Sequence, residues 1–205
     1  MKYIDPDGKG PWETFIFALK NPAISAQIGV ILKNGNNISS IASRFASIGR
    51  TEEKSNAFRH TIWQAIITQI FGSEIAKEVG DAHEKNPKAN LSQRYFCGPK
   101  AKEESDQVTD LLNNNLGREI GKTFSGNIKS LVSYVINIFS NEGLYVNEEN
   151  KSDNSFHVIR KKISQEEIKC YISDLDSRDE NGFTMDEITK LKKNNQIKET
   201  LEISL

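Results

Sequence analysis

The sequence lacks several features that identify common classes of protein. It contains only two cysteines, Cys97 and Cys170, which are too few for a disulfide framework, so we expect two free thiols. No run of about 18 apolar residues is present, and we therefore expect no transmembrane segment. The first ten residues have no apolar centre of the kind found in signal peptides, so export would require another element.

A predominance of charge of one sign is missing as well, since 27 basic residues are balanced by 28 acidic ones. Domains that bind nucleic acid usually carry a basic face, so there is no strong case for nucleic acid as a partner. The motifs GxSxG and CxxC and the phosphate-binding P-loop are also absent. Their absence argues against ordinary serine hydrolases, zinc ribbons and P-loop enzymes.

The sequence does contain repeated helical periodicity, whereas patterns typical of strands are scarce. We expect helices over residues 11–21, 23–32, 38–48, 52–71, 73–85, 102–124 and 128–139, and two short helices after residue 164. We expect loops over residues 86–101 and 141–155, and one short strand over residues 156–159. The predicted fold class is mainly α: a single multi-helix globular domain with short irregular or β segments near the C-terminus.

The predicted helix over residues 52–71 carries polar side chains that packing alone does not require. One stripe, at spacings of three and four residues, consists of Asn56, Arg59, His60, Trp63 and Gln64. The opposite face is apolar and consists of Phe58, Ile62, Ala65, Ile66 and Ile70. A polar side chain buried without a partner is costly, so the stripe must contact other side chains, water or a ligand. An internal hydrogen-bond network would explain any one of these residues, but five on one stripe favour a functional site.

The next predicted helix begins at Ser73, a suitable N-cap, and ends in a histidine followed by a carboxylate. His83 lies on the apolar face, with Glu84 beside it. Histidine is the side chain best suited to proton transfer near neutral pH, and a carboxylate can orient its ring. A buried structural histidine is the alternative. Only three histidines occur in the chain, and two of them lie in this pair of helices.

A third polar face lies in the segment DLLNNNLGREIG, residues 110–121. The apolar face of this helix consists of Val108, Leu112, Leu116 and Ile120. Its other face consists of Asp110, Asn114, Gly117, Arg118 and Gly121. A glycine within a helix costs about 1 kcal/mol relative to alanine, so two of them indicate close approach of another backbone or of a ligand. The alternative is a tight helix crossing with a solvated Arg118.

If the three helices meet, their polar residues form an acid–base cluster. The expected catalytic residues are His60, His83, Glu84 and Asp110. The expected substrate-binding residues are Asn56, Arg59, Gln64, Asn114 and Arg118. Histidine and carboxylate ligands suit zinc or manganese, but no HExxH or HxH spacing occurs, so a divalent metal is not favoured and the cofactor stays open. The acidic turn near Asn181 is not predicted to bind calcium, because Ser177 and Ile188 would occupy the first and last ligand positions; Thr184 is predicted to cap the following helix.

Two stretches resemble known families. The segment KYIDPDGKGP, residues 2–11, resembles the end of the Rhs (YD-repeat) core, a β-cage that carries a variable toxin domain at its C-terminus. The order NAFRHTIWQA, GDAHE, DLLNNNLGREIG resembles a poorly characterised domain at the C-termini of polymorphic toxins, over about residues 50–122. The matching positions are Asn56, Ala57, Phe58, Arg59, His60, His83, Glu84, Asp110, Asn113, Asn114, Gly117 and Arg118.

The resemblance implies a modular toxin that is secreted, delivered into a neighbouring cell and neutralised in the producer by a cognate immunity protein. Residues 1–10 would then be a remnant of the Rhs core. Residues 11–140 would form the helical toxin domain, and residues 141–205 a helical extension of the same domain. The Rhs cage would be the partner of the chain within the full-length protein.

The combined expectation is a secreted antibacterial effector that acts as a hydrolase through its His/Glu/Asp cluster. An envelope lipid or glycan is the preferred substrate class, because the charge balance does not favour nucleic acid. A nuclease toxin is the alternative enzyme. A membrane-disrupting toxin that inserts residues 13–32 and 128–139, or an interaction module with a structural polar network, would need no catalysis.

Overall fold

The computed structural model describes residues 11–29, 37–49 and 51–202, and its fold is mainly α, as predicted. The helices are α1 (Pro11–Lys20), α2 (Pro22–Ile28), α3 (Ile38–Ala46), α4 (Glu52–Phe71), α5 (Ser73–His83), α6 (Ala101–Thr123), α7 (Ile128–Asn141), α8 (Gln165–Asp176) and α9 (Met185–Glu202). The strands are β1 (Tyr95–Phe96), β2 (Leu144–Asn150) and β3 (Ser155–Lys161). Within these described ranges, no helix is both long and apolar enough to cross a membrane.

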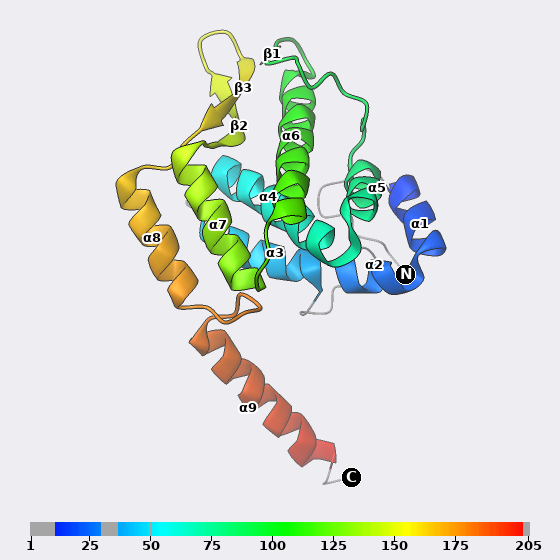
Figure 1. The fold of residues 1–205 in the computed structure, drawn as a ribbon, viewed down its shortest axis with the longest axis vertical. Coiled ribbons are helices and arrows are strands. Elements are labelled where there is room, and N and C mark those ends of the chain that lie inside the picture. Colours follow the sequence, from blue (N-terminus) through cyan, green and yellow to red (C-terminus); the bar gives the residue numbers. More distant parts are fainter. Residues whose placement is uncertain (1–10, 30–36, 50, 203–205) are drawn as a thin grey trace.

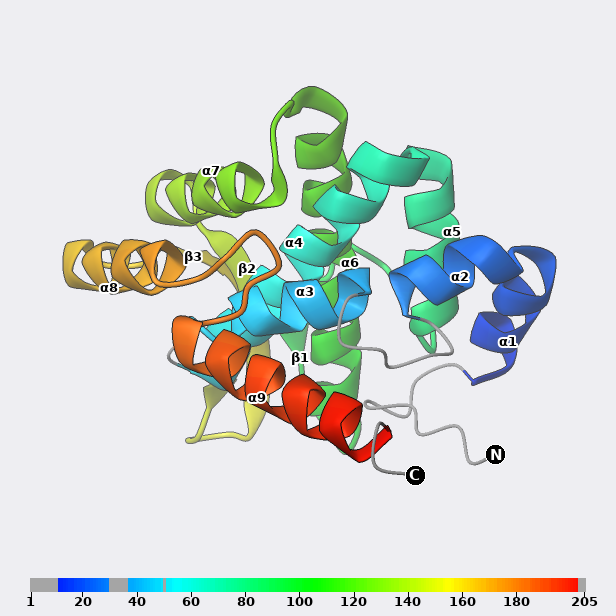
Figure 2. The same ribbon diagram turned by 90° about the horizontal axis from the view of Figure 1, so that it is seen from below.

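Helix α4 lies at the centre of the fold and packs against α3, α5, α6, α7 and β2. Figure 2 shows α1 and α2 on one side of it and α7 and α8 on the other. The N-cap Thr51 fixes its start by accepting a hydrogen bond from the backbone N–H of Lys54, and Gly72 follows its last residue. Rings from three helices fill the core beside it, since the ring of Phe58 lies 6.2 Å from that of Phe139 and 5.6 Å from that of Tyr171.

The glycines of α6 allow its backbone to touch the backbone of α4. A Cβ atom at Gly117 would lie 2.3 Å from the carbonyl oxygen of Thr61, and one at Gly121 would lie 2.5 Å from that of Ala65. Both separations are shorter than a methyl group tolerates, so only glycine fits. The sequence left open whether another backbone or a ligand approaches these glycines, and the structure shows a backbone. The polar stripe of α4 is therefore pressed against the polar face of α6.

The strands form one antiparallel sheet in the order β1-β3-β2, in which Tyr95 pairs with His157 and Val146 with Ile159. The sheet packs on α6 (Figure 1). The predicted loop over residues 141–155 is therefore wrong, because Leu144–Asn150 forms β2. Only Leu144 and Val146 of this strand are buried apolar residues, so the alternation is too short to stand out from its polar surroundings. The two residues of β1 likewise lie within the predicted loop over residues 86–101, whereas the strand predicted at residues 156–159 is confirmed as part of β3.

Several helix ends differ from the sequence predictions. Helix α2 ends at Ile28 rather than near residue 32, because Gly29 takes a left-handed conformation with φ of 92°. Ser73 is the first residue of α5 and not its N-cap, a position that Gly72 holds without any side-chain hydrogen bond. Ile70 was expected in the core but is 53% exposed near the end of α4. The predicted cap at Thr184 is confirmed, because its Oγ1 accepts a hydrogen bond from the backbone N–H of Glu187.

The expected Rhs remnant, residues 1–10, lies outside the described residues.

Candidate functional site

Three helices bring His60, Glu84 and Asp110 together in the interior. His60 lies in α4, Glu84 directly follows α5, and Asp110 lies in α6. One side-chain ligand atom from each residue lies within 4.8 Å of the other two, and none of the three residues is more than 3% exposed. The expected meeting of the three helices is thus present, and it brings one imidazole and two carboxylates together. We refer to His60, Glu84 and Asp110 as the central cluster.

The side chain of Asn114 sets the orientation and tautomer of His60. Its Oδ1 lies 3.0 Å from Nδ1 of His60, while its Nδ2 donates to Oε1 of Glu84 at 3.5 Å. An amide group in this orientation accepts from the imidazole, so Nδ1 carries the ring proton. The other ring nitrogen, Nε2, lies 3.6 Å from Oδ1 of Asp110. His60 therefore directs its bare nitrogen toward a carboxylate oxygen.

Burial keeps His60 neutral at physiological pH. Desolvation lowers the pKa of His60 from 6.5 to about 4; Arg59 and His83 act in the same direction, whereas Asp110 and the hydrogen bond to Asn114 oppose the shift. Asp110 raises the pKa of His60 by less than desolvation lowers it. At pH 7 the imidazole of His60 consequently carries no charge.

Further amide groups hold the two carboxylates. Gln107 donates a hydrogen bond to Oε2 of Glu84 and accepts one from the backbone N–H of Asn86 at 3.0 Å. Asn56 donates to Oδ1 of Asp110 at 2.6 Å and accepts from Nη2 of Arg59 at 2.8 Å. Each member of the central cluster therefore contacts an oriented amide.

Gln107 was not among the residues expected from the sequence. Its position could have been found, because residues 107, 110 and 114 follow one another at helical spacings of three and four on the same face. Asn113, which the family resemblance included, has a different role: it accepts from the backbone N–H of Tyr145 at 3.0 Å and donates to the carbonyl of Tyr145 at 2.8 Å. Asn113 thus attaches β2 to α6.

His83 lies beside the central cluster and not within it. Its ring centroid is 6.1 Å from that of His60 and 5.4 Å from that of Trp63. His83, Asn56 and Arg59 are each partly exposed, whereas His60 is 3% exposed. A molecule approaching from solvent would therefore meet these three side chains before it reached His60.

Gln64 and Arg118 form a separate pair, one helical turn further along α4 and α6. Nη1 of Arg118 donates to Oε1 of Gln64 at 2.9 Å, and Nη2 donates to Asn115. The alternative of a solvated Arg118 is wrong, because this residue is only 8% exposed and Gln64 is fully buried. Within the described part of the chain, the hydrogen bonds of this pair do not reach His60, Glu84 or Asp110.

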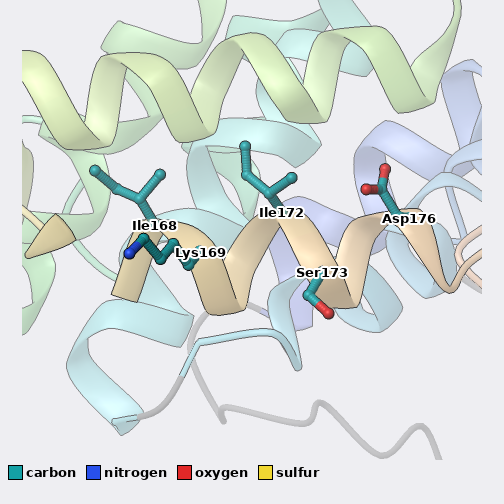
Figure 3. A pocket seen from close by; sticks show the side chains of 5 residues that line it. All are labelled: Ile168, Lys169, Ile172, Ser173 and Asp176. Carbon is teal, nitrogen blue, oxygen red and sulfur yellow. The ribbon is translucent and has the colours of Figure 1, made fainter. Parts of the chain in front are cut away.

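A shallow hollow on the surface lies along α8, away from these polar residues in the fold. It is lined by Ile168, Lys169, Ile172, Ser173 and Asp176 (Figure 3). All five residues come from α8, which supplies none of the side chains of the central cluster. The hollow therefore takes no part in the candidate site.

Comparison with known proteins places the expected site residues within one family. A family described as a domain of unknown function, DUF6973, matches residues 16–143, which is more than half of the chain. The matched region contains every candidate site residue and ends where β2 begins. No curated protein and no solved structure matches the chain. On the extent of this match, the chain belongs to the DUF6973 family.

Proposed function

We propose that the chain is a hydrolase whose reaction centre is the central cluster, and that it serves as the toxin part of a secreted antibacterial effector. The observation that supports a reaction centre is the convergence of one imidazole and two carboxylates from three different helices. Structural packing does not require this group, because burying ionisable side chains is costly. The pKa of His60, which burial lowers to about 4, is perturbed in a way that is common at functional sites.

The partly exposed residues suit contact with substrate. His83 is the histidine that a substrate meets first, so we assign it the proton transfer to or from the reacting group. Arg59 is partly exposed as well, contacts Asn56, and is suited to hold an anionic part of the substrate. His60, Glu84 and Asp110 lie beneath them, and Asn114, Gln107 and Asn56 hold their positions.

The effector context depends on the sequence resemblance. It rests on the Rhs-like residues 2–11 and on the order of the three helical motifs. The same resemblance implies that the toxin is delivered into a neighbouring cell and that a cognate immunity protein is its partner. An envelope lipid or glycan is the proposed substrate class, with nucleic acid as the alternative, because the chain has a net charge of −1.

Membrane disruption by α7 is less well supported. The apolar residues of this helix that would have to insert are buried in the core: Leu131, Val132, Val135, Ile136 and Phe139. Exposing them would require α7 to leave its contacts with α4 and α8. The specific alternative is a purely structural polar network, in which the hydrogen bonds around the central cluster would serve only to join its helices.

Growth of bacteria that produce the chain tests the proposal. The wild type and the His83→Ala variant are each directed to the cytoplasm or to the periplasm, with His157→Ala as the matched control. His157 is the third histidine and lies on β3 with its ring centroid 5.0 Å from that of Tyr95. We expect the wild type and the control to kill and the His83→Ala variant, folded by its melting curve, to be harmless. The killing compartment separates envelope from cytoplasmic substrates. Equal killing by all three proteins, or none by the wild type, would contradict the proposal.

A further inference from the structure

We infer that His60, Glu84 and Asp110 bind one divalent metal ion. The sequence did not favour a metal, because no two ligands occur at the spacing of a known metal-binding motif. The structure removes this objection, since His60 lies in α4, Glu84 directly follows α5 and Asp110 lies in α6, so local spacing is not informative.

The separations of the ligand atoms suit a single ion. Ligand atoms that each lie about 2.1 Å from one ion at tetrahedral angles are about 3.4 Å apart. Nε2 of His60 and Oδ1 of Asp110 are 3.6 Å apart, and the complete set of three lies within 4.8 Å. Small side-chain movements, on the order of 1 Å, would bring all three within the first coordination sphere.

The direction of the imidazole also points to a cation. Nδ1 of His60 faces Oδ1 of Asn114 at 3.0 Å, so Nε2 is the ring nitrogen that faces Oδ1 of Asp110, at 3.6 Å. A cation placed between this nitrogen and this oxygen would be bound by both. Contact of the second ring nitrogen with an oxygen acceptor is how metal-binding histidines are regularly oriented.

Each proposed ligand is held by a second layer of side chains. Asn114 contacts both His60 and Glu84, Gln107 contacts Glu84, and Asn56 contacts Asp110. Such outer contacts fix ligand orientation and are a regular part of metal centres. A structural network would need these hydrogen bonds, but it would not need one ligand atom from each of His60, Glu84 and Asp110 to lie within 4.8 Å of the other two.

Charge supports the same conclusion. Two carboxylates that are 2% and 3% exposed lie close together, and like charges in this arrangement repel strongly. A divalent cation offsets both charges at once. One nitrogen and two oxygen ligands suit zinc or manganese, and a three-ligand site leaves a position for water or substrate. Use of the ion in catalysis rests on the proposed hydrolase function, whereas binding of the ion does not.

Titration calorimetry on the untagged 205-residue chain, freed of metal with EDTA, tests this inference. Mn²⁺ and Zn²⁺ are added in separate experiments to the wild type and to the Asp110→Asn variant. The matched control is Glu119→Gln, which changes an exposed carboxylate on the same helix. We expect one ion per wild-type and control chain, and at least tenfold weaker binding by Asp110→Asn. Absence of binding to the wild type, or equal binding by Asp110→Asn, would overturn the inference.

A second measurement uses only the wild type and so does not depend on a variant that folds. The chain has three histidines, whose ring signals can be followed by NMR as paramagnetic Mn²⁺ is added. We expect the signals of His60 and His83 to broaden before that of His157. Broadening of His157 first would place the ion elsewhere and would refute the proposed site. The growth test separates this result from the hydrolase proposal. If the chain binds the ion but is harmless, the metal site stands and the toxic function is refuted. If the chain kills without binding an ion, the toxic function stands and the metal site is refuted.

Discussion

Gly117 shows how one residue determines the geometry of the candidate site. It lies between Asn114, which holds His60, and Arg118, which pairs with Gln64. At this position α6 contacts the carbonyl of Thr61 so closely that no side chain fits. The polar faces of α4 and α6 can therefore meet only while this position and Gly121 remain glycine.

Replacing Gly117 with alanine should destabilise the protein despite the better helix propensity of alanine. The new Cβ would lie 2.3 Å from a backbone carbonyl oxygen, which cannot rotate away, so the two helices must separate. Overpacking of this kind costs about 1–3 kcal/mol. The better helix propensity of alanine offsets about 1 kcal/mol of the cost of the clash. Urea unfolding should show a lower midpoint for Gly117→Ala, whereas exposed Glu119→Ala on the same helix should change stability by less than about 0.5 kcal/mol. Wild-type stability of Gly117→Ala would mean that the crossing is looser than described.

At the scale of elements, patterns that repeat along one helix could be predicted, and contacts between distant segments could not. The stripe from Asn56 to Gln64 and the polar face of α6 were visible because side chains three and four apart share a face. Strand β2 was missed because its burial depends on α6 and on Asn113, which is 32 residues away from Tyr145. The distance between His60 and Glu84 could not be predicted from the sequence, because it depends on where α5 ends relative to α6.

The start of α8 offers a prediction about pH. Glu167 accepts a hydrogen bond from Lys54 of α4 and another from the backbone N–H of its own N-cap, Ser164, at 2.8 Å. The bond from Lys54 is the main cause that lowers the pKa of Glu167 below its ordinary value of 4.5, followed by the backbone bond. A carboxyl group with a lowered folded-state pKa stabilises the protein above the unfolded-state value. That contribution is lost as the pH falls through the folded-state value.

The Glu167→Gln substitution should therefore destabilise the protein at pH 7 and have progressively less effect below pH 4.5. The loss at pH 7 should stay near or below about 1 kcal/mol, because the pair with Lys54 is partly exposed. Unfolding by urea at a series of pH values measures the difference between variant and wild type. The matched control is Glu166→Gln, an exposed neighbour in the same first turn. A difference that does not change with pH would show that Glu167 acts through packing and not through its charge.

For the whole molecule, the family match and the folded body do not end at the same place. The match stops at residue 143, yet buried apolar residues of the main core continue beyond it, among them Leu144, Val146 and Tyr171. Tyr171 of α8 contacts Phe58 of α4 and Phe139 of α7, so it joins three helices. Helix α9 differs, because it extends away from the body (Figure 1), and its residues Met185 and Leu191 are largely exposed.

Truncation should therefore have unequal effects at two positions. A chain that ends at Gly143 loses β2, β3 and α8, which uncovers the core side of α4 and α7 and removes the partner of Asn113. We expect this chain to lose cooperative thermal unfolding, because each lost kcal/mol lowers the Tm of a domain of this size by about 2–4 °C and several buried side chains are removed.

A chain that ends at Glu187 keeps Phe183, whose ring lies 3.8 Å from the guanidinium of Arg44, and should melt within a few degrees of the full chain. Calorimetry of the three chains measures both expectations. Cooperative unfolding of the shorter chain at the full-length Tm would mean that residues 16–143 fold without the sheet, and that β2, β3 and α8 serve a purpose other than stability.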